Sequence, residues 1–320
     1  MAQKLPSKIE CTVVDAGARY GLHPSWQSVD RLAAFHLFET DHDEVARLQR
    51  KYADHANITV HHAALYHTDT TLTFNIRRHR ALNSLYEVNE DLDYLIEEQA
   101  KLGSYDVAAH TIDGMFANDP VHFLKLDVEG AEIDVLEGAR RALAKTVLGV
   151  RSEVFFARIL NSAASFGAIH AFMTNAGYEL INLDYDGRGA AKSPFTRTNR
   201  FGKLMSSDGV WAVTTDRLFD PARPDRERDV VRLAMFLMLN SASDVALDIL
   251  LRAVNEAGLR FAGFHGDPLF DRLHRDIAHL FKDISYLPSM EMKVLNEAYE
   301  TVFEHPFPTL NEFYESDFLN

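Results

Sequence analysis

Cysteine is almost missing from this sequence of 320 residues, in which Cys11 is the only one. A single cysteine cannot form an intramolecular disulfide, and it cannot supply the several thiolates of a structural zinc site. Long apolar runs are also missing: no segment approaches the roughly 20 apolar residues of a membrane-spanning helix, and the first residues contain no apolar signal core. We therefore expect a cytoplasmic protein without a membrane span.

Positive charge is in deficit. The sequence has 33 Lys and Arg residues against 47 Asp and Glu residues, which gives a formal net charge of -14. Nucleic acids are bound by clustered Lys and Arg side chains, so this composition argues against a nucleic-acid partner. The basic run from Arg77 to Arg80 leaves room for a local patch, but such a run is typical of a solvated loop.

The first two thirds of the chain alternates strand-like and helix-like segments, which predicts an α/β fold with a doubly wound, mostly parallel, seven-stranded sheet. Apolar residues at helical spacing predict helices over residues 43–53 and 132–144. The predicted strands are residues 11–16, 35–40, 58–65, 121–127, 148–156, 178–185 and 210–216.

The segment from Thr68 to Ile112 is too long for a plain connection between a strand and a helix. It contains an additional predicted strand over residues 71–76 and an acidic predicted helix over residues 90–103. We expect this segment to lie at the edge of the functional site.

The character of the chain changes after Asp220, where a charged linker with two prolines precedes segments of helical periodicity. The predicted helices cover residues 229–239, 243–258, 267–284 and 289–305, with Ser243 and Ser289 as N-caps and Gly258 as a C-terminal stop. The prediction is a domain over residues 1–220 and a helical region over residues 221–320.

A glycine turn follows the first predicted strand, in the sequence DAGARYG. Gly17 and Gly21 allow a ligand to approach the backbone at the carboxyl end of this strand. The dinucleotide fingerprint needs a glycine where this chain has Arg19, and Asp15 would repel a pyrophosphate. Asp15 instead favours a cationic cofactor without phosphate, such as S-adenosylmethionine.

The second predicted strand ends in two acidic residues, Glu39 and Asp41. An acid at this position can accept hydrogen bonds from ribose hydroxyls, and Glu39 is the better placed of the two. The alternative is that these residues cap the following helix.

The run FLKLDVEGAE, from Phe123 to Glu132, places three acids after a buried predicted strand. Alternation puts Lys125 and Asp127 on one face, close enough to form an ion pair. Glu129 and Glu132 lie near a helix start, where their charge is favourable, and for Glu132 we prefer this structural role. Asp127 and Glu129 also lie where the reactive end of a cofactor is expected.

The run LKLDVEGAEIDVLEGA resembles the hallmark of the FkbM family of S-adenosylmethionine-dependent methyltransferases, and VVDAGARYG, FHLFETDHDEVARL, HHAALYHTDTTLTF and VRSEVFF resemble its other motifs in order. The resemblance covers about Val13 to Tyr185. Arg19, Tyr20 and Thr40 depart from it. It implies a Rossmann-like methyltransferase sheet and O-methylation of a sugar, glycan or secondary metabolite. The predicted cofactor-binding residues are Asp15, Gly17, Ala18, Gly21, Glu39, Asp41, Ala64 and Asp127.

Methylation of a hydroxyl requires a base, and the candidates are Asp127, Glu129 and Glu153. Glu153 lies in a predicted strand beside two phenylalanines, so its carboxyl group must be paired or have a raised pKa. The alternative is an ion pair with Arg151. These acids could also supply oxygen ligands to a metal ion, but we expect no metal because other roles already explain them.

The helical region has two candidate roles. Because few residues precede the first strand, it could cover the acceptor pocket; alternatively, apolar faces such as LAMFLML could form a homodimer. Two other functions compete with the methyltransferase. One is a catalytically inactive cofactor-binding scaffold, which Arg19 and Tyr20 would favour; the other is a nucleotide-dependent oxidoreductase, against which Asp15 and the missing glycine count.

Overall fold

The computed structural model describes residues 9–89, 100–184, 187–189, 203–283 and 289–304. The chain divides into two compact units. One unit is Cys11–Val213, and the other combines Met1–Glu10 with Thr214–Asn320.

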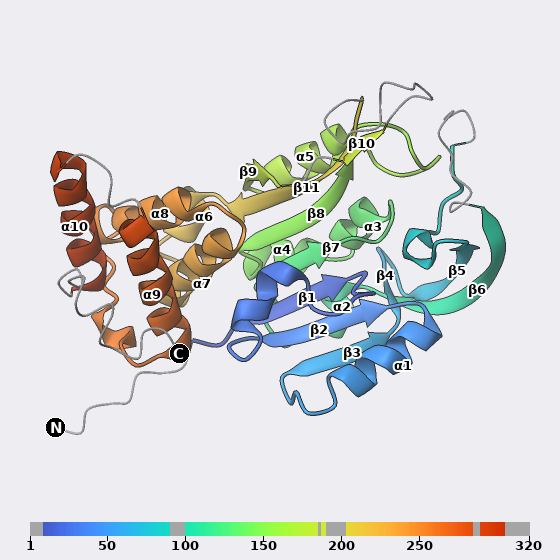
Figure 1. Cartoon of the computed structure of the whole chain (residues 1–320), viewed down its shortest axis with the longest axis horizontal. Coiled ribbons are helices and arrows are strands. Elements are labelled where there is room, and N and C mark those ends of the chain that lie inside the picture. The colour runs from blue at the N-terminus through green and yellow to red at the C-terminus, as the bar shows by residue number, and fades with distance from the viewer. Residues whose placement is uncertain (1–8, 90–99, 185–186, 190–202, 284–288, 305–320) are drawn as a thin grey trace. The chain divides into compact units, whose positions relative to one another are not determined.

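The first unit is built on a mostly parallel sheet, which confirms the predicted fold class (Figure 1). In the described residues the sheet has eight strands in the order β10-β11-β8-β7-β1-β2-β3, and β9 also pairs with β11. Neighbouring strands from β3 to β8 are parallel, whereas β11 is antiparallel to β8. The strands are β1 (Thr12–Ala16), β2 (Ala34–Glu39), β3 (Ile58–His62), β7 (Phe123–Leu126), β8 (Gly149–Phe155), β9 (Tyr178–Leu183), β10 (Gly187–Gly189) and β11 (Lys203–Val213).

The order of the strands reverses between β1 and β7. The chain runs outward from β1 through β2 to β3, and it then crosses back to place β7 on the other side of β1. Ligands of open α/β sheets bind in the crevice at the carboxyl ends of strands at such a reversal. The apolar side chains of the strands are buried, as shown by Val13, Val14 and Leu124, each 0% exposed.

Short helices connect the strands, and one predicted helix is interrupted. The segment 132–144 forms two helices, α3 and α4, separated at Gly138. A Cβ atom on Gly138 would lie 2.1 Å from the carbonyl oxygen of Tyr66, so the close approach of that backbone explains the glycine. The helices of this unit are η1 (Pro24–Val29), α1 (His42–Lys51), η2 (Arg80–Leu82), α2 (Ile112–Met115), α3 (Glu132–Glu137), α4 (Arg140–Lys145) and α5 (Phe166–Asn175).

A second, three-stranded sheet contains β4 (Ala64–Leu65), β6 (Lys101–His110) and β5 (Thr70–Arg77), in that order. The predicted strand 71–76 is therefore confirmed. The predicted helix 90–103 is wrong at its C-terminal end, where β6 begins; residues 90–99 lie outside the described residues. Arg77 was predicted in a solvated loop, but it is buried and donates a hydrogen bond to the carbonyl oxygen of Tyr86.

The second unit is helical, and its described residues contain no strand. Ser243 is the first residue of α8 rather than its N-cap, which is Ala242. Helix α7 contacts α8 and α9, and its apolar residues from Val230 to Leu237 are buried. The apolar excess of LAMFLML is thus accounted for by packing within the chain. The helices are α6 (Thr215–Leu218), α7 (Arg226–Leu239), α8 (Ser243–Asn255), η4 (Ala262–Phe264), α9 (Pro268–Asp283) and α10 (Ser289–Phe303).

Among the described helices, none combines the length and the apolar character needed to cross a membrane.

Candidate functional site

A cavity lies at the carboxyl ends of β1, β2 and β7, where the strand order reverses. Its empty volume, which includes open solvent at the mouth, is about 770 Å³. Strand β5 of the small sheet contributes Phe74 to the wall, and the segment between β5 and β6 contributes Arg80 and Asn83. The predicted site residues that line it are Gly17, Glu39, Ala64, Asp127 and Glu129.

Gly17 brings the turn after β1 against the end of β7. Its φ of +81° is in the left-handed region, and a Cβ atom there would lie 1.7 Å from the carbonyl oxygen of Asp127. The N–H groups of Gly17 and Ala18 both donate to the carbonyl oxygen of Phe38 at 3.0 Å. Any side chain at position 17 would therefore disturb the contact of three strand ends.

Lys125 links two of the predicted acids. Its Nζ lies 3.3 Å from Oδ1 of Asp15 and 3.3 Å from Oδ2 of Asp127, and it donates to the carbonyl oxygen of Gly17 at 3.4 Å. The predicted pair between Lys125 and Asp127 is confirmed. Burial favours a neutral amine, but the two carboxylates outweigh it and raise the pKa of Lys125.

Asp15 has a different position from the predicted one. It is completely buried, it does not line the cavity, and its charge faces Lys125 rather than an open turn. Burial raises the pKa of Asp15, and Lys125 opposes this shift. The structure thus places Asp15 beneath the site, where it orients Lys125.

The two carboxylate oxygens of Glu39 have different environments. Oε1 accepts hydrogen bonds from the backbone N–H groups of Thr40 (2.7 Å) and Asp41 (2.8 Å). The described structure gives Oε2 no partner, and the side chain lines the cavity. Burial raises the pKa of Glu39, although both N–H groups oppose the shift. One oxygen therefore holds the loop and the other can accept hydrogen bonds from a ligand.

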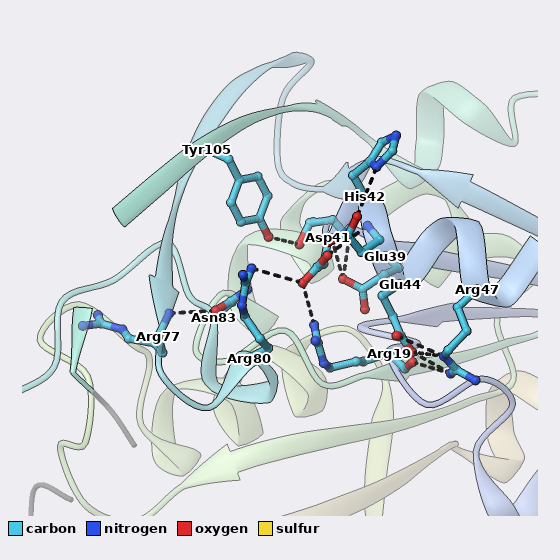
Figure 2. A network of polar contacts seen from close by, with 12 residues as sticks. Arg19, Glu39, Asp41, His42, Glu44, Arg47, Arg77, Arg80, Asn83 and Tyr105 are labelled. Atoms are coloured by element: carbon cyan, nitrogen blue, oxygen red, sulfur yellow. Dashed lines mark hydrogen bonds and ion pairs between the residues drawn. The ribbon is translucent and has the colours of Figure 1, made fainter. Parts of the chain in front are cut away.

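Asp41 caps helix α1, as the alternative interpretation of the sequence proposed. Its Oδ1 accepts a hydrogen bond from the N–H of Asp43 at 3.1 Å. Two arginines approach Oδ2, Arg19 at 3.2 Å and Arg80 at 3.6 Å (Figure 2). Asp41 does not line the cavity, but both arginines do. Its contact with the cofactor stays a prediction.

Asp127, Glu129 and Glu153 converge: one carboxylate oxygen from each lies within 4.8 Å of those from the other two. Asp127 and Glu129 follow β7, and Glu153 lies in β8. Glu129 has a positive φ of 54°. Glu132 stabilises this turn because its Oε1 accepts from the N–H groups of Val128 (3.0 Å) and Gly130 (3.2 Å).

The structure decides between the two interpretations of Glu153. Arg151 pairs with Asp184 and Asp208, each at 2.7 Å, and forms no ion pair with Glu153. Burial, reinforced by neighbouring carboxylates, raises the pKa of Glu153 well above its usual value. The same causes raise the pKa of Glu129.

The family model described as the Methyltransferase FkbM domain matches residues 15–180, a little over half of the chain. The chain belongs to the FkbM methyltransferase family. Membership implies methyl transfer that depends on S-adenosylmethionine. The residues that line the cavity, all between 16 and 131, and the three acids of the carboxylate cluster lie within the matched range.

Solved structures resemble this FkbM chain only distantly. A methyltransferase FkbM from Methylobacillus flagellatus KT is 22% identical with a TM-score of 0.32, over 48% of this chain and 35% of that one, so the match spans about a third of that protein. The 23S rRNA methyltransferase ErmE is 13% identical, with a TM-score of 0.33, over 84% and 93% of the two chains. A candidate methyltransferase from Streptococcus mutans in complex with SAH is 7% identical, with a TM-score of 0.32, over 65% and 92%. A comparison with curated proteins gave no significant match.

Sequence reasoning missed several contacts of the FkbM site. The pairing of Asp15 with Lys125 depends on the register of β1 and β7, which places these residues side by side. Ser84 donates a hydrogen bond to the carbonyl oxygen of Glu129 at 2.6 Å, from a segment without a recognisable motif. A serine in an irregular loop gives no signal from which this contact could have been predicted.

Proposed function

We propose that this chain is an S-adenosylmethionine-dependent O-methyltransferase that acts on a hydroxyl group of a sugar, glycan or secondary metabolite. The observation that carries the proposal is the cluster of Asp127, Glu129 and Glu153, of which Asp127 and Glu129 also line the cavity. Carboxylates at this place can remove the proton that a hydroxyl acceptor must lose.

The cofactor would lie along the cavity wall. We propose that Glu39 accepts hydrogen bonds from its ribose hydroxyls through Oε2, while Gly17 allows close approach of the backbone. When bound, S-adenosylmethionine supplies a methyl group that passes to the acceptor oxygen, with release of S-adenosylhomocysteine. Asp15, Ala18, Gly21 and Asp41 would support this arrangement from behind the wall.

The carboxylate cluster would serve the acceptor. A hydroxyl oxygen becomes a better nucleophile as its proton passes to a carboxylate, and alignment of the oxygen supplies much of the remaining rate enhancement. Asp127 lies on the open side of the cluster, with a side chain that is 45% exposed. We propose a small-molecule or glycan acceptor rather than a nucleic acid, which the net charge of -14 supports.

We propose that the helical region predicted over residues 221–320 is a lid or an oligomerisation region, and that residues 1–220 form the methyltransferase domain. In the structure, the division into compact units falls between Val213 and Thr214.

The test is a methylation assay with S-adenosylmethionine and a panel of sugars, glycans and hydroxylated metabolites. We expect S-adenosylhomocysteine and an acceptor with one added methyl ether, both detected by mass spectrometry. Methylation of nitrogen acceptors alone would contradict O-methylation. Cofactor binding without turnover on the whole panel would favour the inactive scaffold.

A further inference from the structure

Among the residues that the structure describes, the carboxylates of the acidic cluster outnumber the cations that pair with them. Lys125 is shared between Asp15 and Asp127, and Arg151 is occupied by Asp184 and Asp208. Across the described residues, no ion pair or side-chain hydrogen bond reaches the carboxyl group of Glu129 or Glu153. In the described part of the chain, two acids of the cluster therefore have no cationic partner.

Glu153 provides a second, independent observation. Its Oε2 is shielded from solvent and has no hydrogen-bond partner among the described residues. The same carboxyl group points toward Asp127 and Glu129, because its ligand atom lies within 4.8 Å of theirs. A buried carboxylate oxygen without a partner is costly unless it binds a cation or a proton.

The three acids are also held in place before any ligand binds. Glu153 is part of strand β8, where backbone pairing with β11 fixes its position. The turn that carries Glu129 is held by Glu132 from one side and by Ser84 from the other. Preorganised oxygen ligands on rigid elements are what a metal site requires.

We propose that Asp127, Glu129 and Glu153 bind a hard divalent cation of the Mg²⁺, Mn²⁺ or Ca²⁺ type. Oxygen ligands select these ions. Carboxylate oxygens bind Ca²⁺ at about 2.3–2.6 Å and Mg²⁺ at about 2.0–2.1 Å, so three oxygens within 4.8 Å of one another can bind one ion once side-chain rotation brings them closer together. This proposal replaces the expectation of no metal that the sequence suggested.

The role of the ion rests on the proposed function. On the open side, next to Asp127, the ion would coordinate the acceptor hydroxyl and make its proton easier to remove. The proton would then pass to a carboxylate oxygen that does not bind the ion, and the ion itself would be unchanged by the reaction.

The experiment is a titration of the full chain with Mn²⁺, in which free Mn²⁺ is measured by electron paramagnetic resonance. We expect one site, competition by Mg²⁺ or Ca²⁺, and affinity at least about tenfold weaker in Glu153→Gln and Asp127→Asn. Glu179→Gln is the matched control. Glu179 is an exposed glutamate of β9, a strand that pairs with β11, and it is not part of the acidic cluster. It should bind Mn²⁺ as the wild type does.

Two results would overturn the proposal: no Mn²⁺ binding at millimolar concentration, or equal affinity in the wild type and in both cluster variants. Asp127→Asn keeps the test valid if Glu153→Gln fails to fold, because Asp127 is partly exposed. Titration of the same proteins with S-adenosylhomocysteine separates this proposal from the proposed function. Mn²⁺ binding without cofactor binding would contradict the methyltransferase and leave the metal site standing.

Discussion

Replacement of Gly17 by alanine tests the contact between the ends of β1 and β7. An alanine with φ near +81° costs about 1–2 kcal/mol relative to glycine. Its Cβ would also lie 1.7 Å from the carbonyl oxygen of Asp127, and overpacking against a backbone atom adds about 1–3 kcal/mol. We expect Gly17→Ala to lose about 2–5 kcal/mol of unfolding free energy.

Gly21→Ala is the matched control in the same turn. Gly21 has a similar φ of +92°, but the atom that its Cβ would meet is the hydroxyl oxygen of Tyr52, at 2.4 Å. A side chain can move where a backbone carbonyl cannot, so Gly21→Ala should be the less destabilised of the two. Gly17 lines the cavity and Gly21 does not, so Gly17→Ala should lose more cofactor affinity than Gly21→Ala.

Urea denaturation followed by tryptophan fluorescence is a suitable assay, because Trp26 and Trp211 are both buried in the unit Cys11–Val213. Calorimetric titration with S-adenosylhomocysteine gives the second measurement. The reasoning is refuted if Gly17→Ala unfolds within about 1 kcal/mol of the wild type and binds the ligand with unchanged affinity.

Three further predictions concern residues around the site. Glu132→Ala should lose about 1–3 kcal/mol of unfolding free energy, because it leaves two backbone N–H groups without an acceptor, whereas Glu132→Gln keeps an oxygen; equal losses in both would contradict this role. Asp41→Ala should lose about 1 kcal/mol through the cap of α1, which Asp41→Asn retains, as denaturation would show. Burial lowers the pKa of His61 from 6.5 to about 4, so its neutral form stabilises the fold above pH 6.5, and this contribution is lost as the pH falls toward 4. The variant His61→Gln should show a smaller decrease in melting temperature between pH 7 and pH 5 than the wild type. An equal decrease would argue against a half-buried, neutral His61.

The sequence was most informative about the central sheet. Each of the seven predicted strands has a counterpart, because runs such as that around Leu124 are apolar enough to be recognised without knowledge of their neighbours. Two of them were predicted too long: residues 64–65 form β4 in the small sheet, and residues 215–216 belong to helix α6. Strand β6 was missed because it has few buried residues and no regular alternation of apolar and polar residues, and because it follows an acidic segment of helical pattern. The interruption at Gly138 depends on the backbone of Tyr66, which is distant in sequence.

The candidate site was predictable in part. Parallel strands end at one edge of a sheet, so the sequence could bring Glu39, Asp127 and Glu153 to the same region. It could not predict which acids share a cation, since this depends on register and burial: Lys125 faces Asp15, and Arg151 faces Asp208 rather than Glu153.

The measurement that tests the central claim most directly is calorimetric titration of the wild type and of Glu39→Gln with S-adenosylhomocysteine. Glutamine removes the charge of the carboxylate that faces the cavity, and a hydrogen bond to a charged group is worth about 1.5–3 kcal/mol, which is about 10- to 150-fold in affinity. We predict binding to the wild type that is weakened by this factor in the variant. Absence of binding to the wild type, or equal affinity in both proteins, would contradict the account.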